Sequence, residues 1–156
     1  MTAKRCLTIS ELEIGQSYET EFSFTRSEVR SYCELAEDKN SIHSDVEAAR
    51  LRFPDAPDVI VPGGLIQIRI TGLFGSVLPG DGSLGLTFIP DRFRRPIFPG
   101  DFVKVAVILT RLRGAMAEFD IKVCASDGVQ IGAATTRLIV PDEEYKDWWR
   151  KNKKEH

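Results

Sequence analysis

A carboxylate, an amide and an imidazole lie within six positions of one another in the segment CELAEDKNSIHSD, as Asp38, Asn40 and His43. Histidine changes its charge near neutral pH, so His43 could give or take a proton. Asp38 could orient the imidazole or share a water molecule with it, if both groups come within about 2.6–3.2 Å of the protons they move. Asn40 has donors and an acceptor with which to hold its neighbours. The segment is therefore a candidate site for acid and base chemistry.

The same residue types also suit a plain connection between two helices. Asp, Asn and Ser favour turns because their side chains bond to the nearby backbone. Ser44 is expected to cap the following helix whatever the segment does, because Glu47 lies three residues later, at capping-box spacing. From these residues alone, the structural and the catalytic interpretations both stay open.

A second candidate feature is the pair Gly63 and Gly64 in IVPGGLIQI, at the start of an apolar run. The first amides of a helix have no partner within it and lie at the positive end of its dipole. They can stabilise negative charge that develops on a substrate oxygen, and glycine lets a substrate approach the backbone closely. The alternative is that Pro62-Gly63-Gly64 is only a loop that enters a helix.

The composition is that of an ordinary globular domain. The chain has 156 residues, of which 42% are hydrophobic and 28% charged, with a net charge of −2. There is no global basic field that would favour nucleic acid, and no stretch resembles a signal peptide or a membrane span. Three distant cysteines match neither a zinc site nor a disulfide framework. We expect a cytoplasmic single domain, residues 1–156, with a core over about 8–141 and a tail over 142–156.

Three helices are predicted in the first half of the chain. Thr25 and Glu28 form a capping box before an amphipathic run that reaches Ala36. A short helix is expected from Ser44. The run 63–78 is apolar almost all round, so that helix should be buried on most sides.

The remaining runs alternate apolar and polar residues, as strands of a half-buried antiparallel sheet do. They cover residues 17–24, 83–98, 101–113, 116–126 and 129–141. A buried helix flanked by long antiparallel strands predicts an α+β fold in which the sheet wraps around the helix.

The tail EEYKDWWRKNKKEH has two open interpretations besides a solvated segment, which its charge favours. It could be a short amphipathic helix that docks Trp148 or Trp149 on the body. It could also be a basic arm for a polyanion or a membrane surface, built from Arg150, Lys151, Lys153 and Lys154. His156 is the last residue, which leaves His43 as the histidine suited to proton transfer.

Three segments in the same order resemble the MaoC-like hydratases, the (R)-specific enoyl-CoA hydratases of the hotdog fold. They are LAEDKNSIHSDVEAAR, VIVPGGLIQIRITGLFG and LPGDGSLGLTFIPDRFRRPIFPGDFVKV. The likeness covers roughly residues 20–110. It implies a single hotdog domain, in which an antiparallel sheet wraps around a long helix, and it implies a hydro-lyase.

The resemblance also implies roles for particular residues. Asp38 and His43 match the pair that activates the water added to an enoyl thioester, and Asn40 matches the amide that supports them. Gly63 matches the glycine whose N–H polarises the thioester carbonyl, with Gly64 beside it. Thr71 matches a small hydroxyl residue that lines the pocket. Because coenzyme A carries phosphates, Arg92, Arg94 and Arg95 are candidate contacts for them, and so is the basic tail. The alternative is that these arginines are ordinary surface charges on a strand.

The implied partners are an acyl-CoA or other acyl-thioester substrate and a second copy of the chain, since family members are usually dimers. No nucleic acid, membrane, metal or cofactor is expected, coenzyme A being part of the substrate. The chain departs from the family at Ser41, where proline is frequent, and at Pro62, where many members have histidine. Two alternatives remain: a thioesterase, in which water attacks the carbonyl, and a protein that binds acyl thioesters without turnover.

Overall fold

The computed structural model describes residues 4–153, and its centre is a five-stranded sheet in the order β1-β3-β4-β5-β2. All neighbouring strands are antiparallel. The strands are β1 (Ser17–Phe22), β2 (Leu84–Pro90), β3 (Val103–Arg113), β4 (Met116–Ala125) and β5 (Gln130–Ile139). Buried and exposed residues alternate along β4, as expected when one face of a sheet covers a core.

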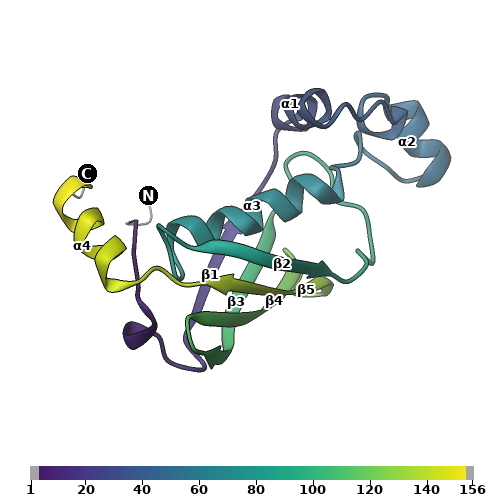
Figure 1. Ribbon diagram of the computed structural model, residues 1–156. Coiled ribbons are helices and arrows are strands. Elements are labelled where there is room, and N and C mark those ends of the chain that lie inside the picture. The colour runs from purple at the N-terminus through teal and green to yellow at the C-terminus, as the bar shows by residue number, and fades with distance from the viewer. Residues whose placement is uncertain (1–3, 154–156) are drawn as a thin grey trace.

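The long helix α3 (Gly63–Ser76) lies along one face of this sheet (Figure 1). Its buried residues are Leu65, Ile66, Ile70 and Phe74. The prediction that this helix is buried on most sides is wrong, because only one side of it is covered and Ile68 on another side is 50% exposed. The ring of Phe74 meets that of Phe119 in β4, with centroids 5.2 Å apart. The α+β prediction, with a sheet around a central helix, is confirmed.

Helices α1 (Arg26–Ala36) and α2 (Val46–Arg52) extend beyond one end of α3 (Figure 1). The predicted capping box of α1 is present, because Thr25 accepts from the Glu28 amide and Glu28 accepts from the Thr25 amide. A short 3-10 turn, η2 (Ser41–His43), joins the two helices.

The strand predicted over 83–98 is wrong in its second half. Regular pairing of β2 ends at Pro90, whose ring nitrogen has no proton to donate to a ladder. The segment after Pro90 still forms two backbone hydrogen bonds to β5, from the Asp91 amide to the Ala133 carbonyl oxygen and from the Arg94 amide to the Ile131 carbonyl oxygen. Residues 91–98 therefore form an irregular loop that is still tied to the sheet.

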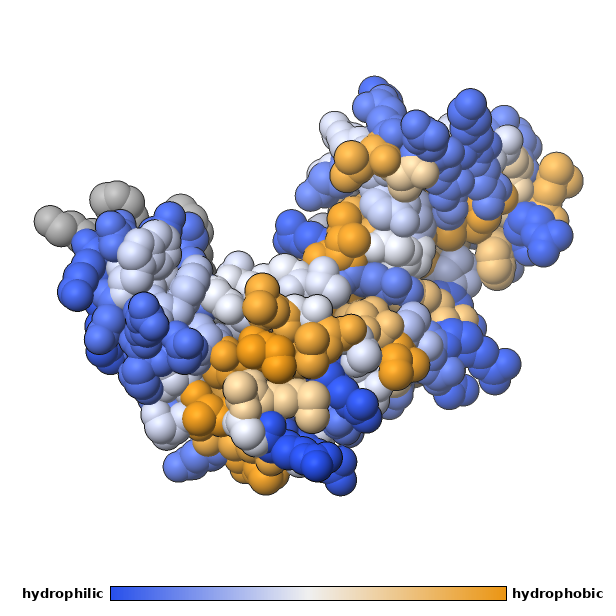
Figure 2. Space-filling model, viewed as in Figure 1, coloured by the Kyte–Doolittle hydropathy of each residue, from blue (hydrophilic) through white to orange (hydrophobic). Residues whose placement is uncertain are grey.

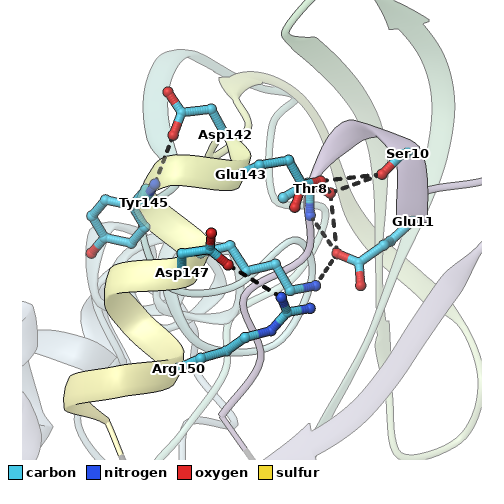
Figure 3. A network of polar contacts seen from close by, with 9 residues as sticks. Thr8, Ser10, Glu11, Asp142, Glu143, Tyr145, Asp147 and Arg150 are labelled. Atoms are coloured by element: carbon cyan, nitrogen blue, oxygen red, sulfur yellow. Dashed lines mark hydrogen bonds and ion pairs between the residues drawn. The ribbon is translucent and has the colours of Figure 1, made fainter.

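The tail is a helix, α4 (Glu143–Asn152), and not a solvated segment. It packs at the opposite end of the molecule from α1 and α2, next to the N-terminal segment with the 3-10 turn η1 (Ile9–Glu11). The Lys146 ammonium is paired with Glu11, and the Thr8 hydroxyl donates to Glu143 at 2.6 Å (Figure 3). The Tyr145 hydroxyl donates to Asp81 at 2.7 Å.

These contacts explain why charge was misleading in the tail. Lys146 lies on the inner side of α4 with 5% of its surface exposed, and the indole nitrogen of Trp149 is buried. Lys154 and His156 lie outside the described residues. No helix within residues 4–153 is long and apolar enough to cross a membrane.

Candidate active site

Asp38 is placed by the way α1 ends. Glu37 adopts a left-handed conformation, with φ of 53°, which turns the chain out of the helix. The Asp38 amide still donates to the Cys33 carbonyl oxygen at 2.9 Å. The carboxylate in turn accepts from the Asn40 amide at 2.9 Å. Asp38 is therefore held through its backbone and its side chain together.

Asn40 and Ser44 serve the turn in ways that the sequence does not reveal. The Asn40 side chain caps η2, accepting from the Ile42 amide at 3.4 Å. Ser44 follows η2 as its C-terminal cap, so its predicted role as cap of α2 is wrong. Asp45 caps that helix instead, and accepts from the Glu47 amide at 2.8 Å.

His43 lies between two hydrogen-bonding groups. Its Nδ1 is 2.6 Å from the Ile60 carbonyl oxygen, and its Nε2 is 3.7 Å from Oδ2 of Asp38. A carbonyl oxygen can only accept, so Nδ1 carries a proton. In the neutral ring Nε2 then presents a lone pair toward the carboxylate. The distance of 3.7 Å is too long for a direct hydrogen bond. Both groups are therefore available to hydrogen-bond the same third group.

Two hollows meet at His43. The larger, of about 550 Å³, is lined by Asp38, Asn40, His43 and surrounding polar residues. Positive and negative side chains are equal in number on its wall: Arg26, Arg30 and Lys39 against Glu34, Glu37 and Asp38. The smaller, of about 260 Å³, is mainly apolar and also contains Gly63. The structure thus brings His43 together with both Asp38 and the start of α3.

The N-terminus of α3 has no side-chain cap. The amides of Leu65 and Ile66 donate to the Pro62 carbonyl oxygen at 3.0 and 3.4 Å. Those of Gly63 and Gly64 have no acceptor among residues 4–153. Two free N–H groups therefore lie at the positive end of α3.

The space that these glycines leave is taken by two aromatic side chains. A Cβ atom on Gly63 would lie 3.0 Å from the Phe93 ring, and one on Gly64 would lie 1.9 Å from the Tyr32 hydroxyl oxygen. Phe93 also rests against Gly132 in β5. Neither Tyr32 nor Phe93 was expected at the site from the sequence. The glycine pair signalled a close approach, but nothing in the sequence indicated which residues approach it.

The remaining predicted site residues, Thr71 and the three arginines, do not all lie at the same hollow. Arg94 and Arg95 line the smaller hollow with His43, and Arg92 does not. Nη2 of Arg95 donates to both carboxylate oxygens of Asp127, at 2.9 and 3.0 Å. Thr71 lies two turns along α3, lines a separate hollow beside β2, and donates to the Ile68 carbonyl oxygen at 2.9 Å. The structure does not bring Thr71 to the Asp38 and His43 pair.

One thiol lines the larger hollow. Burial, and then the nearby Asp38 carboxylate, raise the pKa of Cys33 above its ordinary value, which keeps it in the less reactive protonated form. Within residues 4–153, no three His, Cys, Asp or Glu side chains are grouped as a metal site would require.

The chain is similar in sequence to the (R)-specific enoyl-CoA hydratase of Aeromonas caviae, with 36% identity over 107 residues. The match covers 69% of this chain and 78% of that protein. No family model matches the chain. The fold is close to that of unliganded R-hydratase PhaJ1 from Pseudomonas aeruginosa, with a TM-score of 0.82, 25% identity, and coverage of 91% and 90% of the two chains.

A second solved structure supports the same assignment. The A. caviae (R)-hydratase involved in PHA biosynthesis matches with a TM-score of 0.76 and 31% identity, over 83% of this chain and 98% of that one. The sequence match and the shared fold therefore point to the same group of proteins. The chain belongs to the (R)-specific enoyl-CoA hydratases of the MaoC-like family, hydro-lyases of the hotdog fold.

Proposed function

We propose that this protein catalyses the reversible hydration of a trans-2-enoyl-CoA to a (3R)-hydroxyacyl-CoA, with Asp38 and His43 as the catalytic pair. One observation carries the proposal: Nε2 of His43 lies 3.7 Å from the Asp38 carboxylate, while Nδ1 is held by Ile60. A water molecule between the two groups could donate to both. The name of the A. caviae relative supplies the substrate class.

The chemistry follows from the protonation of the ring. Asp38 accepts one hydrogen bond from the water and orients it. The lone pair of Nε2 takes the other proton as the water oxygen bonds to the β-carbon, and the electrons of the double bond move toward the thioester carbonyl. The α-carbon then receives a proton from Nε2, so one molecule of water has been added. Positioned acid and base groups of this kind contribute roughly 10²–10⁴-fold in rate.

The free amides at the start of α3 serve the carbonyl. Negative charge develops on the thioester oxygen during the addition, and preorganised N–H donors stabilise it more than they stabilise the substrate. Gly63 lines the hollow that also holds His43, which supports its N–H as the first donor. Gly64 offers a second free amide in the same turn.

Arg94 and Arg95 are proposed contacts for the phosphates of coenzyme A, because they line the smaller hollow and carry positive charge. Each has an acidic neighbour, Asp91 for Arg94 and Asp127 for Arg95. These pairs are exposed, so solvent weakens them and a phosphate could compete. Arg92 completes the basic cluster in sequence but does not line the hollow.

The working form is proposed to be a homodimer joined along β2. This strand has one neighbour in the sheet and so presents an unpaired edge. Leu84, Leu86 and Ile89 are 64%, 53% and 61% exposed on it. Figure 2 shows apolar side chains gathered over the part of the molecule where Figure 1 draws β2. A second copy of this edge would cover them.

The decisive assay follows loss of the conjugated enoyl-thioester absorbance with crotonyl-CoA, beside a colorimetric assay for free thiol. Wild-type protein should consume the enoyl group without releasing thiol. Asp38→Asn should lower kcat by about 10²–10⁴-fold. Glu34→Gln is the matched control, since Glu34 lines the same hollow but is not one of the polar partners of His43, which are Ile60 and Asp38.

Each alternative outcome has a distinct meaning. Thiol release in step with loss of substrate would show a thioesterase and overturn the hydratase assignment. Binding of crotonyl-CoA in calorimetry without turnover would show a non-catalytic acyl-thioester protein. Turnover of the same acyl group on an acyl carrier protein, but not on coenzyme A, would replace the proposed carrier.

A further inference from the structure

We propose that the Tyr32 hydroxyl is a third hydrogen-bond donor to the thioester carbonyl, acting beside the amides of Gly63 and Gly64. This inference rests on the proposed function and adds a substrate-contacting residue to it. The Tyr32 hydroxyl oxygen occupies the space that a side chain at position 64 would take.

The hydroxyl is available to a ligand. Tyr32 forms no hydrogen bond with any residue in the range 4–153. The Tyr32 hydroxyl oxygen is also not fully buried. Among residues 4–153, the indole nitrogen of Trp149 is the one buried side-chain nitrogen or oxygen that has no hydrogen-bond partner. The Tyr32 oxygen, which has no partner either, is therefore accessible to solvent. An unpaired donor that reaches solvent beside two other unpaired donors is suited to bind an oxygen acceptor.

The hydroxyl is also firmly placed. The ring of Tyr32 packs against the main hydrophobic core, so that its tip is directed by packing and not by a local hydrogen bond. Tyr32 belongs to the last turn and a half of α1, the helix whose end positions Asp38 through the Cys33 carbonyl. The donor is thus carried by α1, and the catalytic carboxylate follows two residues after that helix ends.

Glycine at position 64 is the condition for this arrangement. Any larger residue would have its Cβ atom 1.9 Å from the hydroxyl oxygen and 2.9 Å from the ring carbon that bears it, well inside contact distance. Gly64 therefore keeps the phenol against the first turn of α3. The amide of the same residue stays free.

The test is Tyr32→Phe, which removes the donor and keeps the ring. We expect kcat for crotonyl-CoA to fall on the order of 10²-fold, with KM and thermal stability near wild type, because a carbonyl donor acts chiefly on the transition state. Tyr18→Phe, which removes a hydroxyl from β1, should keep wild-type kcat. A purely structural hydroxyl would instead lower the melting temperature and leave kcat unchanged.

A spectroscopic measurement separates this proposal from the proposed function. Hexadienoyl-CoA bound to Asp38→Asn should show a carbonyl stretch at lower frequency than in water, because donors polarise the bond. Adding Tyr32→Phe should reverse part of that shift. Full activity of Tyr32→Phe, or an unchanged carbonyl stretch, overturns the role of Tyr32 while Asp38→Asn still tests the hydratase.

Discussion

The Ile60 carbonyl oxygen accepts a hydrogen bond of 2.6 Å from Nδ1 of His43. This one contact decides which ring nitrogen is free, because it requires the proton on Nδ1 and leaves the lone pair on Nε2. Ile60 lies 17 residues along the chain, and its amide donates in return to the Ile42 carbonyl oxygen at 2.9 Å. These two hydrogen bonds therefore fix the turn η2 against the segment that precedes α3.

Two replacements of His43 should separate chemistry from stability. The amide of Asn in His43→Asn can still donate to the Ile60 carbonyl, so the fold should persist while kcat falls by about 10²–10⁴-fold. His43→Leu leaves that carbonyl without a donor and should also cost about 1–3 kcal/mol in the free energy of unfolding. Urea unfolding and the absorbance assay measure the two effects. Equal activity of His43→Asn and wild type would exclude His43 as the acid and base.

Alanine should have opposite effects at two glycines of α3. Gly64→Ala drives a methyl group into the Tyr32 hydroxyl and should lower the free energy of unfolding by about 1–3 kcal/mol. At Gly72 a Cβ atom meets nothing within 4 Å, so Gly72→Ala should gain up to about 1 kcal/mol from helix propensity. Thermal unfolding of both variants checks the contrast. A destabilised Gly72→Ala would mean that another molecule covers this face in solution.

The Glu11–Lys146 pair should make part of the stability sensitive to acid. The hydrogen bond from Lys146, followed by that from the Thr8 amide, lowers the pKa of Glu11 below its ordinary 4.5. Its contribution is complete above the unfolded-state value and is lost as the pH falls through the lower folded-state value. Unfolding free energies at about pH 7 and about pH 3 should therefore differ less in Glu11→Gln than in wild type.

The control for this pair is Lys146→Met, which fills a similar volume without charge. It should reduce the same pH dependence, because the Glu11 carboxylate loses its principal partner. Glu11→Gln alone leaves a buried ammonium group without its counter-ion and should destabilise on the order of 1–3 kcal/mol at neutral pH. An unchanged difference between the two pH values in both variants would show that other carboxylates account for the acid sensitivity.

Charges on β2 should break the proposed dimer. Leu84→Glu and Ile89→Glu each place a carboxylate on the exposed edge strand, where it would be buried in the joined sheet at a high desolvation cost. We expect monomers in size-exclusion chromatography with light scattering. Ile14→Glu is the control, since Ile14 is 66% exposed but lies in the turn before β1. A dimer that survives both changes would place the interface elsewhere.

Much of the fold was readable from the sequence because local patterns and packing agree. The capping box at Thr25 and Glu28 begins α1 as predicted, and the apolar run from Gly63 forms a helix as predicted, although only one side of that helix is buried. Alternation along 101–113 and 116–126 predicted β3 and β4 within about two residues at each end. Both periodicities follow from side-chain direction in a helix or a strand, which depends on near neighbours alone.

The sequence alone determined the residues that could carry out the chemistry: Asp38, His43 and the glycines at the start of α3. Which atoms face each other was decided by tertiary structure, because Ile60 reaches His43, Tyr32 reaches Gly64 and Phe93 reaches Gly63 from segments at least 17 residues away. Tertiary packing also made the tail a docked helix, since burial of Lys146 depends on Glu11, 135 residues away. The sequence shows which side chains are charged and so favour water. Only the folded structure shows which of them are buried because an oppositely charged side chain pairs with them.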